Sequence, residues 1–226
     1  MPVAPLPFVR AELVSVSRRL HENGWVANHD GNVSVRLHGD RLLITPTAYS
    51  KRDVDDASLI IVDFDGKVLE GRKKPFSELE LHVAIYRARP EVDAVIHAHP
   101  PYATAAGLAG VELSPVAMPE IVVSLGARIP LLPRVMPRDK GGVDAVFKAA
   151  GAGDVMMLQG NGAFTCGPDL SLALLRMELV EHWAKIFTLA RSMGTVPALA
   201  DADVQKLLEA RKKAGLGPRS ETPAKK

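Results

Sequence analysis

The stretch VDAVIHAHP at residues 92–100 restricts the fold of this chain more than any other. Its run of small and β-branched apolar residues predicts a buried strand, which the double proline at its end terminates. Because side chains alternate between the two faces of a strand, Val95, His97 and His99 lie on one face and Ala98 on the other. Buried imidazoles need polar partners, so the fold must bring further polar groups to this strand end.

Two histidines one residue apart on a strand face can bind one divalent metal ion. Imidazole nitrogens bind zinc at about 2.0–2.1 Å, and a complete catalytic site needs at least one more ligand and an acid–base group. The structural alternative is a pair of polar side chains that hydrogen-bond to nearby loops. The apolar run before His97 favours the metal site, because it places the histidines near the core.

The chain around this strand predicts one mixed α/β domain over residues 1–215, followed by a polar tail at 216–226 that we expect to be disordered. Further elements are expected as helices at 8–22, 101–110, 143–151, 169–193 and 201–214, as hairpins around residues 38–40 and 65–66, and as strands at 127–133, 154–159 and 161–167. Short β-rich runs joined by Gly-containing turns indicate many antiparallel strand pairs.

The segment that starts at Ser77 predicts a helix leading into the histidine strand. Ser77 and Glu80 have the spacing of a capping box, with Ser77 as the N-cap residue. Glu78 in the first turn is not needed for that cap, so it is a candidate acid–base group. The alternative is that Glu78 only interacts favourably with the helix dipole. An N-cap serine also lies among free backbone N–H groups, which can bind an anion.

The overall charge balance excludes several classes of partner. The chain has 28 basic and 26 acidic side chains and a formal charge of +2, which gives no electrostatic basis for binding nucleic acid or an anionic membrane. A single cysteine, Cys166, excludes an internal disulfide and fits a reducing compartment. No apolar run approaches about 20 residues, and we find no signal-peptide pattern. We expect a cytoplasmic protein that binds a small-molecule substrate.

Six short motifs follow one another in a fixed order, and this order is more informative than any single motif. GNVS, ITPT, DGKVLEG, a Pro-x-Ser-Glu helix start, VIHAHP and LQGNGAFTCG follow one another along the chain. Over roughly residues 8–192 this series resembles the class II aldolase/adducin family, which contains aldolases, epimerases, decarboxylases and dehydratases. The resemblance implies a mainly antiparallel central sheet flanked by helices on both faces, a three-layer α/β sandwich. It also implies a homotetramer with active sites at subunit interfaces.

The resemblance also assigns roles to individual residues. His97 and His99 match the metal ligands of the family, and Glu78 matches its acidic acid–base residue. Positions that hold a substrate phosphate in the family are matched by Gly31, Asn32, Thr47 and Ser77. The implied cofactor is a divalent metal, with zinc expected first and manganese, cobalt or iron as alternatives.

The chain departs from the family pattern at three positions. Asn161 stands where the third histidine ligand is expected, and an amide oxygen is a harder and weaker ligand than imidazole. His182 could replace it only if the fold brings the long helix to the site. In the phosphate-binding positions, Ala48 replaces a glycine and Phe76 replaces a serine. These last two changes suggest a substrate end that is not a phosphate and is planar or apolar.

These observations favour a metal-dependent carbon–carbon lyase of aldolase type. Such an enzyme cleaves a small hydroxy-carbonyl substrate, a sugar phosphate or a related compound, through a metal-stabilised enediolate. The alternative is a metal-dependent decarboxylase of a hydroxy-aryl or β-keto acid on the same scaffold, which Phe76 and the altered phosphate positions favour. A non-catalytic, adducin-like scaffold is a third interpretation, and it rests on Asn161.

Overall fold

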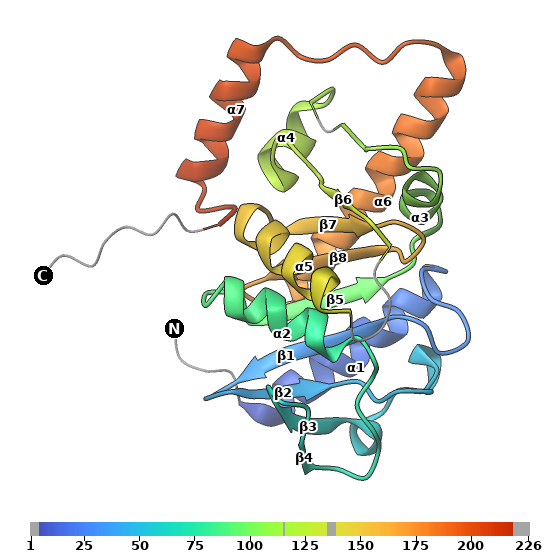
Figure 1. Cartoon of the computed structure of the whole chain (residues 1–226), viewed down its shortest axis with the longest axis vertical. Helices are drawn as coiled ribbons and strands as arrows, with labels where there is room; N and C mark the ends of the chain where they lie inside the picture. Colours follow the sequence, from blue (N-terminus) through green and yellow to red (C-terminus); the bar gives the residue numbers. More distant parts are fainter. Residues whose placement is uncertain (1–4, 115, 135–138, 219–226) are drawn as a thin grey trace, which may run out of the picture.

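The structure is a computed structural model that describes residues 5–114, 116–134 and 139–218 (Figure 1). Within these residues eight strands form one sheet in the order β4-β3-β2-β1-β5-β8-β7-β6. All neighbouring strands are antiparallel except β6 and β7. The strands are β1 (Asn32–Leu37), β2 (Arg41–Ile44), β3 (Ile60–Asp63), β4 (Val68–Glu70), β5 (Ala94–Ala98), β6 (Leu131–Leu132), β7 (Val155–Leu158) and β8 (Ala163–Gly167). The predicted mainly antiparallel sheet is confirmed.

Helices cover both faces of this sheet, so the predicted three-layer arrangement is also confirmed. The helices are α1 (Leu6–Glu22), α2 (Leu79–Ala88), α3 (Pro101–Leu108), α4 (Pro119–Leu125), α5 (Lys140–Ala152), α6 (Leu170–Met193) and α7 (Asp201–Lys213). Helices α2 and α5 lie on one face, and α1, α3 and α6 lie on the other, while α4 packs against α7 (Figure 1). No helix in the described ranges is both long enough and apolar enough to cross a membrane.

The two faces of β5 belong to two separate hydrophobic clusters. Ile96 and Ala98 pack in the cluster with α1 and α6, whereas Val95 packs in the cluster with α2 and α5. The ring of His97 stacks on Phe164, which belongs to this second cluster. The predicted alternation is therefore confirmed for Val95, His97 and Ala98. A shift of one residue in the register would exchange the two faces, so this packing fixes which way His97 points.

Most expected elements lie within a few residues of their predicted positions, with two differences. A strand was predicted over 127–133, but β6 contains only Leu131 and Leu132, because Pro130 and Pro133 lack the N–H that a strand ladder needs. Helix α4 was not predicted, although Pro119 at its first turn is a typical helix-start residue. Of the predicted tail at 216–226, residues 219–226 lie outside the described part of the chain.

The predicted capping box at Ser77 is wrong. Helix α2 begins at Leu79, Glu78 occupies the N-cap position, and no side chain caps the helix. Phe76 is buried, with its ring centroid 4.9 Å from that of His82, and the Glu78 carboxylate is held by two amides. Because the residues on both sides of Ser77 point inward, Ser77 is left exposed and cannot reach the helix backbone.

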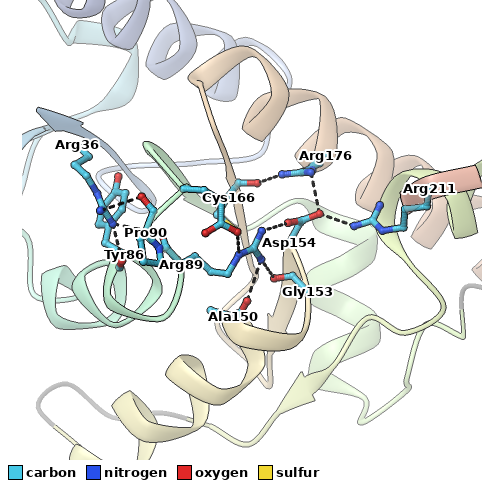
Figure 2. Close-up of polar contacts among 11 residues, drawn as sticks. Arg36, Tyr86, Arg89, Pro90, Ala150, Gly153, Asp154, Cys166, Arg176 and Arg211 are labelled. Atoms are coloured by element: carbon cyan, nitrogen blue, oxygen red, sulfur yellow. Dashed lines mark hydrogen bonds and ion pairs between the residues drawn. The ribbon is translucent and has the colours of Figure 1, made fainter. Parts of the chain in front are cut away.

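A buried ionic network fastens three helices to the start of β7 (Figure 2). The Asp154 side chain is fully buried and forms salt bridges with Arg89 at 3.0 Å, Arg176 at 2.8 Å and Arg211 at 2.5 Å. Arg89 follows the last residue of α2, Arg176 lies on α6 and Arg211 on α7. One carboxylate therefore holds the ends of elements that are far apart in the sequence.

Candidate active site

Polar side chains from four segments meet at one end of the sheet. Strands β1 and β5 are antiparallel and pair Asn32 with His97, so the start of β1 lies beside the end of β5. Strand β8 pairs Ala163 with Ala98, which brings the preceding turn with Asn161 to the same place. Glu78, just before α2, completes the group because α2 packs on this face. The fold thus brings together the four predicted catalytic and metal-binding residues nearest to β5.

His97 is fully buried, and its ring has a defined tautomer. The ring stacks on Phe164 with a centroid separation of 4.2 Å. Its Nδ1 atom lies 3.1 Å from the carbonyl oxygen of Ala163, which can only accept a hydrogen bond, so Nδ1 is the protonated nitrogen. Burial lowers the pKa of His97 and keeps the ring neutral. The other nitrogen, Nε2, therefore presents a lone pair to the site.

His99 is partly exposed and lies between a carboxylate and the other site residues. Its Nδ1 atom is 3.5 Å from Oδ2 of Asp30. Its Nε2 atom is 3.3 Å from Nε2 of His97 and 3.1 Å from Oδ1 of Asn161. Gly162 allows this approach, because a Cβ atom there would lie 2.1 Å from the carbonyl oxygen of Ala98. The glycine turn thus sets Asn161 against His99.

These donor atoms fit a divalent metal ion. Ligands at about 2.0–2.1 Å in a tetrahedral site are about 3.3 Å apart, which matches the two distances from His99. Nδ1 of each ring lies beside an acceptor, so a metal ion bound between the two Nε2 atoms would leave both Nδ1–H groups with a partner. The third donor is an amide, and within the described ranges no three His, Cys, Asp or Glu side chains form a metal-binding group.

The carboxylate of Glu78 is held beside the histidines in its ionised form. Oε1 accepts a hydrogen bond from Nδ2 of Asn161 at 2.6 Å, and Oε2 accepts one from Nδ2 of Asn32 at 2.8 Å. Oε2 also lies 3.4 Å from Nε2 of His97. Burial alone raises the pKa of Glu78, but the hydrogen bonds from the amides of Asn161 and Asn32 stabilise the carboxylate and lower the pKa below its usual range. The group can therefore accept a proton.

His82 on α2 is a site residue that the sequence prediction missed. Its Nε2–H donates to Oδ1 of Asn32 at 2.6 Å, and its Nδ1 lies 2.7 Å from Oγ of Ser34. Tyr86 donates from its hydroxyl to the carbonyl oxygen of Ser34 at 2.9 Å. Burial lowers the pKa of His82 to about 3, so the ring is neutral. His82 follows Glu78 by four residues, the spacing of one helix face, and that spacing was the available signal.

The predicted phosphate-binding residues differ in how accessible they are. Gly31 has a φ of +67°, and a Cβ atom there would lie 2.9 Å from the carbonyl oxygen of His97, so only glycine fits. Thr47 and Ser77 are exposed, and their hydroxyls are free to meet a ligand. Ala48 keeps a glycine-like φ of +51° although it carries a Cβ atom. The side-chain amide of the fourth predicted residue, Asn32, already forms hydrogen bonds with Glu78 and His82.

Two residues discussed from the sequence lie away from the site. Phe76 is buried against His82, so it faces the core and gives no support to a planar or apolar substrate end. His182 is exposed on α6, in a shallow hollow that Tyr102 and Lys185 also line. It does not supply the third histidine ligand, because it forms no metal-binding group with His97 and His99.

A three-layer α/β fold with this cluster at a sheet end defines a class of protein with a candidate divalent-metal centre. Residues 11–188 match the class II aldolase and adducin N-terminal domain. The chain belongs to the class II aldolase and adducin family.

Named relatives and a solved structure agree with this assignment. The chain is 32% identical to the 3-oxo-tetronate 4-phosphate decarboxylase of Escherichia coli, over 79% of this chain and 85% of the relative. It is 27% identical to the 5-deoxy-D-ribulose 1-phosphate aldolase of Bacillus thuringiensis, over 88% and 92%. A structure of L-fuculose 1-phosphate aldolase superimposes with a TM-score of 0.84 at 26% identity, over 92% and 98%.

These relatives are aldolases and decarboxylases, so the enzyme class predicted from the sequence, a carbon–carbon lyase, is confirmed. The main prediction and its alternative use the same scaffold. Class II aldolases depend on a divalent metal ion and act on small molecules.

Proposed function

We propose that this chain is a zinc-dependent lyase that cleaves a carbon–carbon bond of a small phosphorylated hydroxy-carbonyl compound by aldolase-type chemistry. One observation carries the proposal. The Nε2 atoms of His97 and His99 face each other at 3.3 Å while their Nδ1 atoms lie beside the acceptors Ala163 and Asp30. With a metal ion bound, both Nε2 atoms would direct a lone pair at it while each Nδ1–H keeps a partner.

His97, His99 and Asn161 are the residues that would hold the metal, and manganese, cobalt or iron could take the place of zinc. When bound, the metal supplies positive charge that stabilises negative charge on substrate oxygens as the bond breaks. Glu78 accepts the proton and returns it, since its carboxylate is ionised and held in place from both sides by amides. Asn32 and His82 keep that carboxylate oriented.

The names of the relatives support a phosphorylated substrate. Both the decarboxylase and the aldolases carry a sugar-type phosphate in their names. The exposed hydroxyls of Thr47 and Ser77 would bind the phosphate, and Gly31 would shape the backbone between the metal and that group. The amide of Asn32 has two protein partners, which supports a role in positioning Glu78.

Decarboxylation of a phosphorylated β-keto acid is a second candidate function. It is supported by the 32% identity to the decarboxylase of Escherichia coli, which equals the identity to the L-fuculose phosphate aldolase of the same organism. Both reactions leave negative charge next to a carbonyl group, so the same residues serve either one. They differ in whether an aldehyde or carbon dioxide leaves.

A panel of substrates tests both functions. The zinc-loaded protein is incubated with phosphorylated ketoses, 4-phosphorylated 3-oxo acids and hydroxy-aryl carboxylates, while aldehyde and carbon dioxide are measured. We expect turnover in one of the first two groups, and its loss in the His97→Ala/His99→Ala double variant. Turnover confined to the hydroxy-aryl carboxylates would contradict the proposed substrate class. Equal turnover by the double variant would contradict the proposed site.

We also propose a homotetramer with active sites at its subunit interfaces, which the family resemblance supports. Light scattering at micromolar concentration should give four times the chain mass of 24.3 kDa. A monomeric mass together with full activity would contradict a site shared between subunits.

A further inference from the structure

Lys51 is a buried lysine beside the candidate active site. It begins the short 3-10 helix Lys51–Asp53, and only 1% of its surface is exposed. Its Nζ atom donates to the carbonyl oxygens of Tyr49 at 2.9 Å and His29 at 3.3 Å. Within the residues that the structure describes, no carboxylate forms an ion pair with it. Burial lowers its pKa to about 8, so the amine still carries its proton at neutral pH.

The two carbonyl partners place the ammonium between two loops of the site. His29 lies two residues before Gly31, in the loop that enters β1, and Tyr49 lies two residues after Thr47, in the loop that leaves β2. Gly31 and Thr47 belong to the positions expected to surround the substrate phosphate. The carboxylates of Asp30 and Glu78 both act on Lys51 electrostatically, which places it on the same side as the site.

Hydrogen bonding and local charge both favour an anion beside Lys51. An ammonium group has three donors, and two are used by carbonyl oxygens. Asp30 and Glu78 offset part of the burial cost of the Lys51 charge without pairing directly with it, and a bound anion would supply that direct ion pair. If a divalent ion is bound at the histidines, the ion and Lys51 together carry three positive charges. Asp30 and Glu78 carry two negative charges, so the net charge of the group is +1, which favours an anion.

We propose that Lys51 is the cation that binds the anionic end of the substrate, an oxyanion that is either a phosphate or a carboxylate. The oxyanion lies between the two loops and accepts the third Nζ–H. This inference rests on the proposed function, because it assumes that a substrate occupies the site. In the structural alternative, Lys51 only fastens the two loops together and has no effect of its own on anion affinity.

Calorimetric titration separates these two roles. The zinc-loaded parent is titrated with inorganic phosphate and, separately, with acetate at constant ionic strength, so that the two probes distinguish a phosphate site from a carboxylate site. Lys51→Met should weaken binding of the preferred probe by about 10- to 100-fold, the size expected for one charge-assisted hydrogen bond. Lys67→Met, at an exposed position between β3 and β4, removes the same charge and should bind as the parent does.

Zinc content, measured on the same samples, keeps this inference separate from the proposed function. A parent that holds zinc but binds neither probe overturns the role of Lys51 and leaves the metal centre intact. Parent-like binding by a folded Lys51→Met variant overturns it as well. Should that variant fail to fold, the Nζ resonance of Lys51 in ¹⁵N-lysine-labelled parent protein gives the answer. The resonance should shift on titration with the bound probe, and an unchanged resonance contradicts the inference.

Discussion

The side-chain amide of Asn161 joins the carboxylate of Glu78 to the histidine cluster. Its Nδ2 atom donates to Oε1 of Glu78 at 2.6 Å, and its Oδ1 atom lies 3.1 Å from Nε2 of His99. One short side chain thus supplies a donor to the proposed acid–base group and an acceptor beside the proposed metal position. An asparagine can hold both groups at once, although its oxygen is a weaker zinc ligand than imidazole.

This double role predicts opposite effects in an Asn161→His variant. Zinc affinity should rise by at least about tenfold, because imidazole is the better zinc ligand. Turnover should fall, because Glu78 loses the amide that helps to lower its pKa. Competition with a chelator measures the affinity, and a substrate assay measures the rate. If the variant binds zinc no more tightly than the parent, Asn161 is not a ligand.

Glu78→Gln should remove the base while keeping the fold and the metal. A positioned general acid or base contributes about 10²–10⁴-fold in rate, so kcat should fall by that factor with little change in KM. Glu80→Gln is the matched control, because Glu80 is exposed on the same helix and should leave kcat unchanged. Unchanged turnover in Glu78→Gln would leave this carboxylate with no role in the chemistry.

The lowered pKa of Lys51 predicts that its contribution to the free energy of unfolding increases in alkaline solution. Its pKa is about 8 in the folded protein and near 10.5 when exposed, so between these values the unfolded chain binds more protons. The free energy of unfolding contributed by Lys51 therefore increases as the pH rises from about 8 to about 10.5. In metal-free protein, the change in the free energy of unfolding between the two ends of this window, measured by denaturation, should be more positive in the parent and in Lys67→Met than in Lys51→Met, because other buried groups such as Cys166 titrate equally in all three. An equal change in Lys51→Met and in the parent would contradict the assignment.

Asp154→Asn should be strongly destabilising, because three buried arginines lose their common partner. Breaking a buried pair typically costs about 3–5 kcal/mol in the free energy of unfolding. Asp203→Asn offers a control, since Asp203 forms an exposed pair with Lys206 that is worth at most about 1 kcal/mol. Chemical denaturation measures both. A loss at Asp154 no larger than at Asp203 would mean that the network does not support the fold.

The sequence predicted β5 and its histidines because alternation is a local pattern that the core enforces. The start of α2 could not be predicted in this way. Its capping-box spacing is equally local, but contacts of Glu78 with Asn32 and Asn161, 46 and 83 residues away in the sequence, overrode it. His82 lies in an apolar helix face, where a single polar residue does not by itself predict a functional role. Its role became visible only from its hydrogen bond to Asn32, which is 50 residues away in the sequence.

Lys51 shows the same limit for a loop residue. A lysine in a polar segment is usually exposed, and only the fold brings His29, 22 residues earlier, against its ammonium group. The order of the motifs in the sequence was enough to predict the family. The hydrogen-bond partners of each side chain could not be predicted, because they depend on how distant loops pack.

The proposed function requires that His97 and His99 together hold a divalent metal ion. Its most direct test is the metal content of the purified protein, by mass spectrometry of the elements, for the parent and for His97→Ala/His99→Ala. A Glu80→Gln control, folded as judged by circular dichroism, accompanies them. We predict about one divalent ion per chain in the parent and the control, and none in the double variant. A folded double variant that retains the metal content of the parent would place the metal somewhere other than His97 and His99.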